Sequence, residues 1–312
     1  MLPHGAGSPV PGGPGGHPTC DGMPVVVRRV GALAALALAA AVLLLWPATS
    51  RAHGSHSERE RETSERIARD PRDPVNYVER AEVYREAGHR AEAEADLARA
   101  TALAPEHPAV VMLAAKLRLD RKEPAAAGRI LDALLARDPG NGRARSLRAD
   151  ALEAEGRVAE AARQLERAIA DTDPPAPDQY LQLARLLVAS RPPDSARAVR
   201  MLERGIDRLG PAPGLIARRV ELALALGRFD EALSWHDRLR PFMESDPVWL
   251  VRRGELLEVS RRTLEALAAY TAALEAIEAL PPRRRAALVA AGLEADVRTR
   301  LHRSSPGRME SP

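Results

Sequence analysis

The chain contains one cysteine, two lysines and few aromatic residues, and each scarcity narrows what it can be. Cys20 is the only thiol among 312 residues, which excludes a disulfide framework in any compartment. Only 3% of the residues are Phe, Trp or Tyr, so a core has to be built from aliphatic and alanine side chains. Strand signals are also missing, because no stretch after residue 53 alternates polar residues with β-branched ones over a strand length.

The motifs that identify common enzyme families are missing too. The sequence has no Gly-x-x-x-x-Gly-Lys phosphate loop, no His-Glu-x-x-His zinc motif, no paired-cysteine metal motif and no Gly-x-Ser-x-Gly nucleophile turn. We therefore predict a non-catalytic protein with no cofactor and no metal site.

The balance of charge argues against nucleic acid as a partner. The chain has 46 Lys+Arg and 43 Asp+Glu; residues 1–52 hold three of the arginines and one aspartate, which leaves 43 against 42 in the rest. A nearly neutral domain lacks the basic face that nucleic-acid binding requires. Lysine occurs only at Lys116 and Lys122, and this dominance of Arg, together with abundant Ala, suggests a high-GC bacterial gene.

The chain does contain a repeat of about 34 residues. A Gly-x-x-x-Glu-Ala turn appears at 88–93, 156–161 and 227–232, and Gly88 and Gly156 lie two periods apart. A fixed period in this range is typical of a solenoid, in which each unit buries its apolar face against its neighbours. The composition, rich in Ala, Leu, Glu and Arg, favours helices throughout.

These residues resemble tetratricopeptide repeats (TPRs), a family of paired antiparallel helices. The resemblance implies an all-α solenoid of about six stacked repeats, with a charged lead-in at 53–73, a capping helix within 281–302 (helical over 283–302) and a disordered tail at 303–312. We place the repeats at 74–107, 108–141, 142–176, 177–212, 213–246 and 247–280.

Small residues recur where paired helices have to approach closely. A larger side chain fills the space between the small positions of each second helix, and the fifth unit departs from this pattern with Val220, His236 and Leu239. The small positions in three units are Ala81, Ala93 and Ala100; Ala149, Ala161 and Ala168; and Gly254, Ala266 and Ala273. The larger residues are Leu97, Leu131, Leu165, Leu202 and Tyr270.

The N-terminal region reads as an export signal. Val30 to Trp46 are uncharged, follow Arg28-Arg29 and precede a short polar segment that ends in Ser50-Arg51-Ala52. We predict a signal peptide within 23–52, cleaved after Ala52; the alternative is an uncleaved membrane anchor, for which the run is short. Both interpretations place the repeats outside the cytoplasm. Residues 1–22 form a Gly/Pro-rich leader that we expect to be disordered, and translation from Met23 would omit it.

Three other features carry candidate chemistry, and each also has a plain structural interpretation. His53, His56 and Glu58 could bind copper after cleavage, but the flanking Gly and Ser predict a solvated tail. His236 in the fifth unit is expected to be a packed, hydrogen-bonded side chain. The basic run 283–285 could meet an anionic surface, although a solvated turn before the capping helix is favoured.

In TPR proteins the first helix of each repeat lines a concave groove that commonly receives extended peptides or helices. At the groove-facing offsets, apolar side chains alternate with basic ones. Our candidate partner-binding residues are Met112, Lys116, Leu119, Arg143, Leu181, Arg185 and Val188; the other residues at the groove-facing offsets are Val75, Val78, Glu82, Arg85, Ser146 and Asp150.

The function predicted from the sequence is protein–protein scaffolding in the bacterial cell envelope, in the periplasm or at the inner membrane facing it. The partner would be a protein or peptide bound in the groove, and a membrane would be involved only if Val30 to Trp46 is retained. Two alternatives stay open: a membrane-anchored assembly factor, and an accessory subunit that holds a metal or small molecule through the His53 tail. A peptide carboxylate clamp is not expected, because Val78, Glu82 and Lys116 occupy most of its positions.

Overall fold

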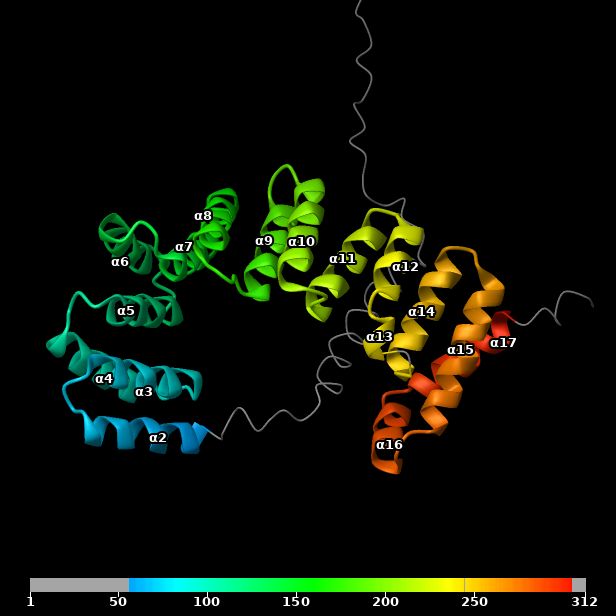
Figure 1. Cartoon of the computed structure of the whole chain (residues 1–312), viewed down its shortest axis with the longest axis horizontal. Coiled ribbons are helices and arrows are strands. Elements are labelled where there is room, and N and C mark those ends of the chain that lie inside the picture. The colour runs from blue at the N-terminus through cyan, green and yellow to red at the C-terminus, as the bar shows by residue number, and fades with distance from the viewer. Residues whose placement is uncertain (1–55, 244, 305–312) are drawn as a thin grey trace, which may run out of the picture. The chain divides into compact units, whose positions relative to one another are not determined.

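The described part of the chain, residues 56–243 and 245–304 of a computed structural model, is built of helices and turns and contains no strand (Figure 1). The chain divides into two compact units, 1–49 and 50–312, and all the described helices belong to the second. The prediction of an all-α solenoid is confirmed. The repeat helices are α3 (Pro74–Glu86), α4 (Arg90–Leu103), α5 (Pro108–Asp120), α6 (Pro124–Arg137), α7 (Gly142–Ala154), α8 (Val158–Asp171), α9 (Pro177–Ala189), α10 (Ser195–Leu209), α11 (Pro213–Ala225), α12 (Phe229–Asp237), α14 (Pro247–Val259) and α15 (Thr263–Glu278).

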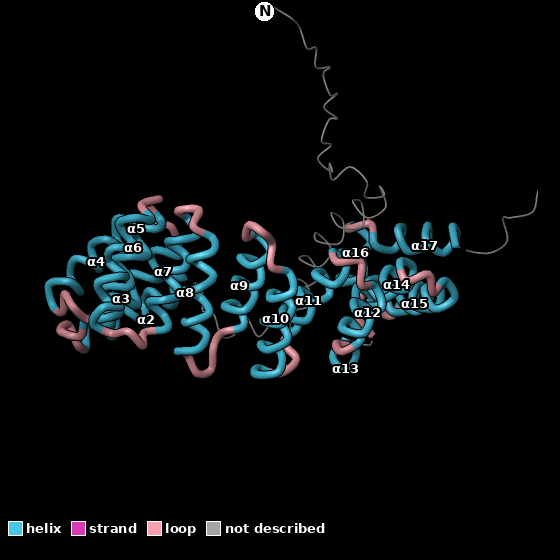
Figure 2. The backbone as a smooth tube through the Cα atoms, turned by 90° about the horizontal axis from the view of Figure 1, so that it is seen from above, coloured by secondary structure: helices cyan, strands magenta, loops and turns pink. Residues whose placement is uncertain are grey.

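These helices pack as consecutive antiparallel pairs, α3 with α4, α5 with α6, and so on to α14 with α15 (Figure 2). The first helix of every pair begins at the first residue of a predicted unit. Proline is the first residue in five of these helices, where its missing N–H costs nothing. Asp73, Asn141 and Asp246 cap three of them by accepting hydrogen bonds from backbone N–H groups one turn ahead.

Glycine ends the first helix in three of the pairs. Gly88, Gly156 and Gly227 have φ angles of +80°, +76° and +70°, which glycine adopts without strain. Each sits in the short turn before the second helix, so the recurring Gly-x-x-x-Glu-Ala pattern encodes the reversal of the chain.

Small residues and their larger neighbours form the core between paired helices. All nine small residues named from the sequence are buried, and so are Leu131, Leu165, Leu202 and Tyr270; Leu97 is half-buried. At Gly254 even one methyl group would not fit, because a Cβ there would lie 2.7 Å from Cδ1 of Tyr270. Gly205 is packed in a similar way, with the position of its missing Cβ 2.8 Å from Cγ of Tyr180.

The fifth pair is distorted, and its sequence explains why. Its second helix, α12, has only 9 residues and is followed by the single turn α13 (Arg240–Met243). A continuous helix would place the ring of Pro241 against the carbonyl of Asp237, where α12 ends. Val220 and Leu239, which replace the usual small residues, are nevertheless 4% and 6% exposed, so the pair still closes over its core.

His236 takes the place of the buried leucine in this pair and is held by two hydrogen bonds with Trp249. Its ring stacks on the indole at 5.0 Å between centroids, its Nε2 lies 3.1 Å from the Trp249 carbonyl, and Nε1 of Trp249 donates to the His236 carbonyl. A carbonyl only accepts, so Nε2 carries a proton and donates it to this bond. The expectation of a packed, hydrogen-bonded histidine is confirmed, and burial lowers its pKa to about 4.

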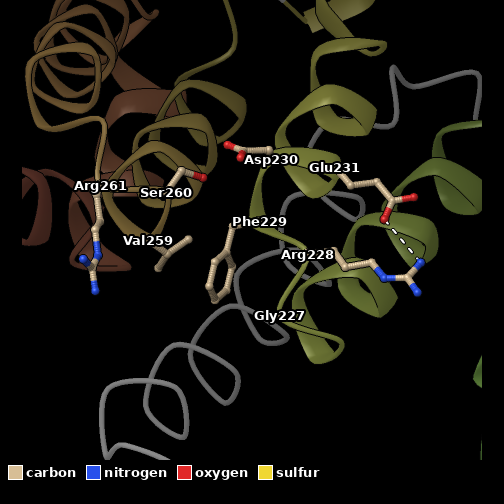
Figure 3. A pocket seen from close by; sticks show the side chains of 8 residues that line it. All are labelled: Gly227, Arg228, Phe229, Asp230, Glu231, Val259, Ser260 and Arg261. Carbon is tan, nitrogen blue, oxygen red and sulfur yellow. Dashed lines mark ion pairs between the residues drawn. The ribbon is translucent and has the colours of Figure 1, made fainter.

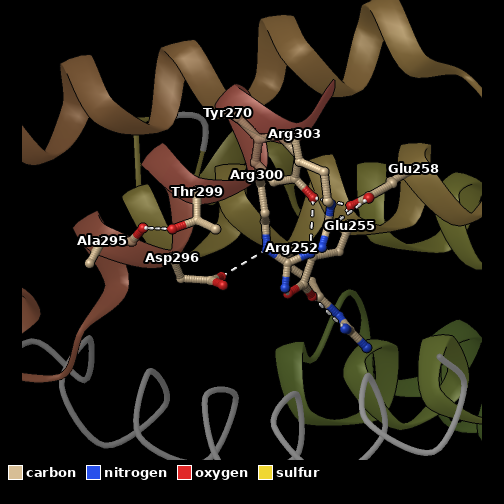
Figure 4. A network of polar contacts seen from close by, with 9 residues as sticks. All are labelled: Arg252, Glu255, Glu258, Tyr270, Ala295, Asp296, Thr299, Arg300 and Arg303. Carbon is tan, nitrogen blue, oxygen red and sulfur yellow. Dashed lines mark hydrogen bonds and ion pairs between the residues drawn. The ribbon is translucent and has the colours of Figure 1, made fainter. Parts of the chain in front are cut away.

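The C-terminal cap differs from the prediction. In place of one helix over 283–302 there are two, α16 (Pro282–Ala290) and α17 (Leu293–Ser304), separated at Gly292 with a φ of +76°. The predicted tail is also shorter, since residues 303 and 304 belong to α17. Arg300 of α17 lies 2.8 Å from Asp296, 3.3 Å from Glu258 and 3.3 Å from the Tyr270 hydroxyl, which fastens α17 to the last pair (Figure 4).

At the other end, the charged lead-in also caps the array. The helix α2 (His56–Arg69), which lies within the predicted charged lead-in, packs against α3. Its Thr63 is 4% exposed, the hydroxyl of Tyr84 donates to Glu60 at 3.1 Å, and Arg59 pairs with Glu86 at 2.7 Å. This face contact explains why a sequence with few apolar residues forms a stable helix here.

Several predictions fall on residues outside those that the structure describes. They are the Gly/Pro-rich leader at 1–22, the start at Met23, the apolar run Val30–Trp46, the cleavage site after Ala52, His53, and the tail beyond residue 304.

We predict that His236 makes the stability of the array depend on pH. The pKa of the folded state is below the ordinary value of 6.5, so the unfolded state binds more protons between pH 6.5 and pH 4. Stability is therefore lost as the pH falls through this window, by roughly 3 kcal/mol for a shift of this size. Urea unfolding at pH 7 and pH 4 should show this loss in the parent protein and a smaller one in His236→Leu.

The matched control is His302→Gln, which removes a histidine exposed on α17. It should keep the full pH dependence of the parent. Equal pH dependence in His236→Leu and the parent would contradict the assignment.

Candidate groove formed by the first helices

The first helices of neighbouring pairs lie beside one another, α3 against α5, α5 against α7, and α9 against α11. Residues at the same helix offset therefore form rows that cross from repeat to repeat. We define the inner row as the residues eight positions after the start of the first helix in each of the first four repeats: Glu82, Lys116, Asp150 and Arg185. Their charges alternate in sign along these four repeats.

In the first two repeats the inner row is linked by ion pairs. Nζ of Lys116 lies 2.5 Å from Oε1 of Glu82, across 34 residues of sequence. Nε of Arg85 donates to the other oxygen of Glu82 at 2.8 Å, and Nη1 of Arg85 lies 3.5 Å from Asp120 of the next repeat. The charges of Glu82 and Lys116 thus offset each other within the protein.

A second set of contacts joins α7 to α9. Nε2 of Gln182 donates to Oδ1 of Asp150 at 2.6 Å, and Nε2 of Gln179 donates to the Ser146 hydroxyl at 2.8 Å. Nη2 of Arg185 donates to Oε2 of Glu153 at 2.7 Å. Polar side chains in this part of the face are consequently ordered before any partner arrives.

Burial and neighbouring charges set the ionisation of these acids. Burial raises the pKa of Asp150, Gln182 and the cations Lys116 and Arg185 act against that rise, and the charge of Glu153 adds to it. The hydrogen bond from Arg185 lowers the pKa of Glu153. The guanidinium group of Arg185 is therefore already bound to Glu153 within the protein, and a ligand would contact it only in competition with Glu153.

The seven predicted groove residues divide into three groups. Lys116 and Arg185 are occupied by internal ion pairs. Arg143 is exposed, and among the described residues it has neither an ion pair nor a hydrogen bond. The four apolar side chains are half-buried against the core, so they present edges to solvent and not a continuous apolar patch: Met112 and Leu119 pack on one cluster, Leu181 and Val188 on another.

Sequence reasoning missed the polar partners Glu153, Gln179 and Gln182. A signal was present, because each pairs with a residue 32 or 33 positions away on a neighbouring first helix. Comparing residue types 32 or 33 positions apart on successive first helices would have found them.

Two open hollows lie at turns between repeats. One, of about 390 Å³, adjoins the inner row through Asp150 and is completed by Leu119, Asp120, Lys122, Pro124 and Ala154. The other, of about 480 Å³, lies between the turns of the fifth and sixth repeats (Figure 3). Its lining residues are Gly227, Arg228, Phe229, Asp230, Glu231, Val259, Ser260 and Arg261, with Arg228 3.6 Å from Glu231.

Within the described residues 56–243 and 245–304, no group of His, Cys, Asp and Glu side chains is arranged to hold a metal ion. His56 is the exposed first residue of α2. In the same range, no helix combines the length and the apolar character needed to cross a bilayer.

The sequence of residues 84–151, from the end of α3 through most of α7, matches the tetratricopeptide repeat family. The chain resembles this family over that segment. No curated protein matches it as a relative. The match covers only part of the array, from the first helix pair into the third.

Solved structures of TPR proteins share the fold. PilF of Pseudomonas aeruginosa is 19% identical, with a TM-score of 0.51 over 65% of this chain and 91% of PilF. PilW, a widely conserved type IV pilus biogenesis factor, is 17% identical, with a TM-score of 0.50 over 71% and 97%. The C-terminal part of a TPR protein from Cytophaga hutchinsonii is 16% identical, with a TM-score of 0.52 over 72% and 95%. At these identities the likeness concerns the fold alone.

Proposed function

We propose that this TPR protein is a non-catalytic scaffold that binds an extended peptide or a helix of a partner protein along its first helices. The observation that carries the proposal is the face formed by α5, α7 and α9. It combines the edges of half-buried apolar side chains with polar groups already fixed by internal contacts. A surface ordered before binding loses less conformational entropy when a partner docks.

The contacts suggest which groove residues would bind the apolar parts of a partner and which would bind its charged part. Met112 and Leu119 on α5, and Leu181 and Val188 on α9, offer apolar edges on the helices that flank α7. Arg143 is the basic groove residue whose charge is not offset by a neighbour in the described part of the chain. A partner that places an acidic group beside α7 and apolar side chains on either flank fits this arrangement.

A clamp for a peptide carboxylate is not part of the proposal. Such a site needs free cations, and Lys116 is already paired with Glu82 at 2.5 Å. The ion pair between Glu82 and Lys116 links α3 to α5 and helps to fix their register. Lys116 is then not free to bind the C-terminal carboxylate of a peptide.

Photo-crosslinking in cells tests the groove directly. A photoreactive phenylalanine analogue placed at Leu119 or Leu181 should give a crosslinked adduct with the partner, and Arg143→Glu should reduce that adduct because it reverses the unpaired charge nearby. The expected reduction is about tenfold, the size typical of one well-placed interfacial charge.

Two controls test whether the crosslinks depend on the groove itself. The same analogue at Ala133, exposed on α6, should give no comparable adduct. Arg191→Glu, which reverses an equally exposed charge in the turn after α9, should leave the groove adducts intact. Adducts that are equal at Ala133, or that survive Arg143→Glu unchanged, would remove the groove assignment.

We also propose that the scaffold works in the bacterial cell envelope, with its repeats outside the cytoplasm. The support is the order of Arg28-Arg29, the uncharged run Val30–Trp46 and the small residues that end at Ala52. A membrane-anchored assembly factor is the second candidate, favoured by the same run if it is retained.

Mass spectrometry of the N-terminus of the native protein separates these two candidates. Cleavage predicts a mature chain that begins at His53, whereas an anchor predicts peptides that contain intact Val30–Trp46. Recovery of the protein from the cytoplasm with its N-terminal run intact and no membrane association would contradict both.

A further inference from the structure

The second helices carry a set of exposed arginines that the groove does not use. We define the arginine ridge as Arg129 of α6, Arg163 and Arg167 of α8, and Arg200 and Arg204 of α10. All five are exposed, and among the described residues none of them makes an ion pair or a hydrogen bond. Most other arginines of the array do make such contacts, so this set stands apart.

The register of the second helices places these side chains on one face. Leu131, Leu165 and Leu202 point into the core and are fully buried. Arg129, Arg163 and Arg200 each precede one of these leucines by two residues, and Arg167 and Arg204 each follow one by two. Two residues turn a helix by roughly 200°, so all five point away from the core in successive repeats.

The acids beside the ridge are committed elsewhere. Each residue that directly follows a buried leucine is acidic, and each binds an arginine of another helix. The pairs are Asp132 with Arg148 at 2.7 Å, Glu166 with Arg197 at 2.6 Å and Glu203 with Arg219 at 3.0 Å. One exposed acid, Asp207, follows Arg204 by three residues. The near-neutral composition thus hides a local excess of positive charge.

The surroundings of the ridge indicate the kind of partner. Exposed residues near it on the same helices are alanines, among them Ala133, Ala159, Ala170 and Ala196. A protein interface needs apolar or aromatic anchors at its centre, and nucleic-acid binding gains from aromatic stacking; small alanines supply neither. Guanidinium groups that stand on a plain helical surface instead suit an array of phosphates, which each can bind with two N–H groups.

We propose that the arginine ridge holds the array against an anionic phospholipid surface through the headgroup phosphates. Nine residues separate the apolar run Val30–Trp46 from the first residue described, which allows a distance of at most about 35 Å in extended chain. A retained run would therefore tether the array to the bilayer, and a cleaved chain would reach it by charge alone. The lipid assignment rests on the envelope placement proposed above but not on the groove.

Vesicle binding by the full chain tests the ridge. Vesicles of phosphatidylcholine alone measure what the apolar run contributes, and vesicles with added phosphatidylglycerol measure the extra contribution of negative charge. The parent protein should bind the anionic vesicles roughly tenfold more tightly or better, and added salt should reduce the difference. Changing all five ridge arginines to Gln should abolish the increment.

A second variant carries the same change of charge away from the ridge. It replaces five exposed arginines in turns and at helix starts, Arg72, Arg90, Arg191, Arg261 and Arg283, with Gln. This variant should retain the increment, and circular dichroism should show parental helicity for both variants. Should the ridge variant prove unfolded, Arg163→Gln with Arg200→Gln should still lose part of the increment.

Three outcomes would overturn the proposal: equal binding to neutral and anionic vesicles, an increment that the ridge variant retains, or an equal loss in both variants. Arginine-dependent binding of a single-stranded oligonucleotide that exceeds binding to anionic vesicles would also overturn it. Failure here leaves the groove crosslinks unaffected, so the two proposals stand or fall separately.

Discussion

The close approach of paired helices at small side chains is the constraint on which the rest of this structure depends. At Gly254 the ring of Tyr270 occupies the space that a Cβ would need, and at Gly205 the ring of Tyr180 does the same. Ala81, Ala93 and Ala100 play the equivalent part in the first repeat, where all three are fully buried. Helices that pack this closely leave their outer faces free, and those faces carry both proposed binding surfaces.

Charge then distinguishes the two faces. Three ion pairs connect a second helix to the next first helix across the same sequence separation: Asp132–Arg148, Glu203–Arg219 and Asp237–Arg253. On exposed surfaces such pairs contribute little energy, but they fix which charges remain available. Acidic side chains between repeats and in the inner row are already in contact with other side chains of the protein. The side chains of the ridge arginines and of Arg143 have no ion pair or hydrogen bond in the described chain.

The sequence predicted the helix pairs well because their ends are marked by residues with local physical roles. Proline starts, glycine turns and small core positions act within one or two turns of helix, and the boundaries at Pro74, Pro108 and Pro247 follow from them. The prediction of a single capping helix was wrong because one residue, Gly292, divides this segment into two helices. From sequence alone, a glycine in an otherwise helical pattern can lie inside a helix or end it. Here the packing of α17 on Tyr270 shows which of the two occurs.

The groove was harder to foresee than the fold. Lys116 and Arg185 were predicted as available cations, yet each has an acidic partner about one repeat away in sequence. Contacts of this range depend on how neighbouring repeats are set against each other, and offsets within one repeat do not contain that information. The same limitation hid the contact of α2 with α3, which is made by polar and charged side chains that meet only when the two helices lie side by side.

Thermal unfolding of two helical glycine variants tests the packing constraint most directly. Gly254→Ala introduces a methyl group into the ring of Tyr270, whose hydroxyl is also bonded to Glu258 at 2.9 Å, and should destabilise the array by about 1–3 kcal/mol despite the better helix propensity of alanine. Gly214→Ala meets its nearest atom at 3.7 Å and should stabilise it by about 0.5–1 kcal/mol. Equal stability of the two variants would contradict the account.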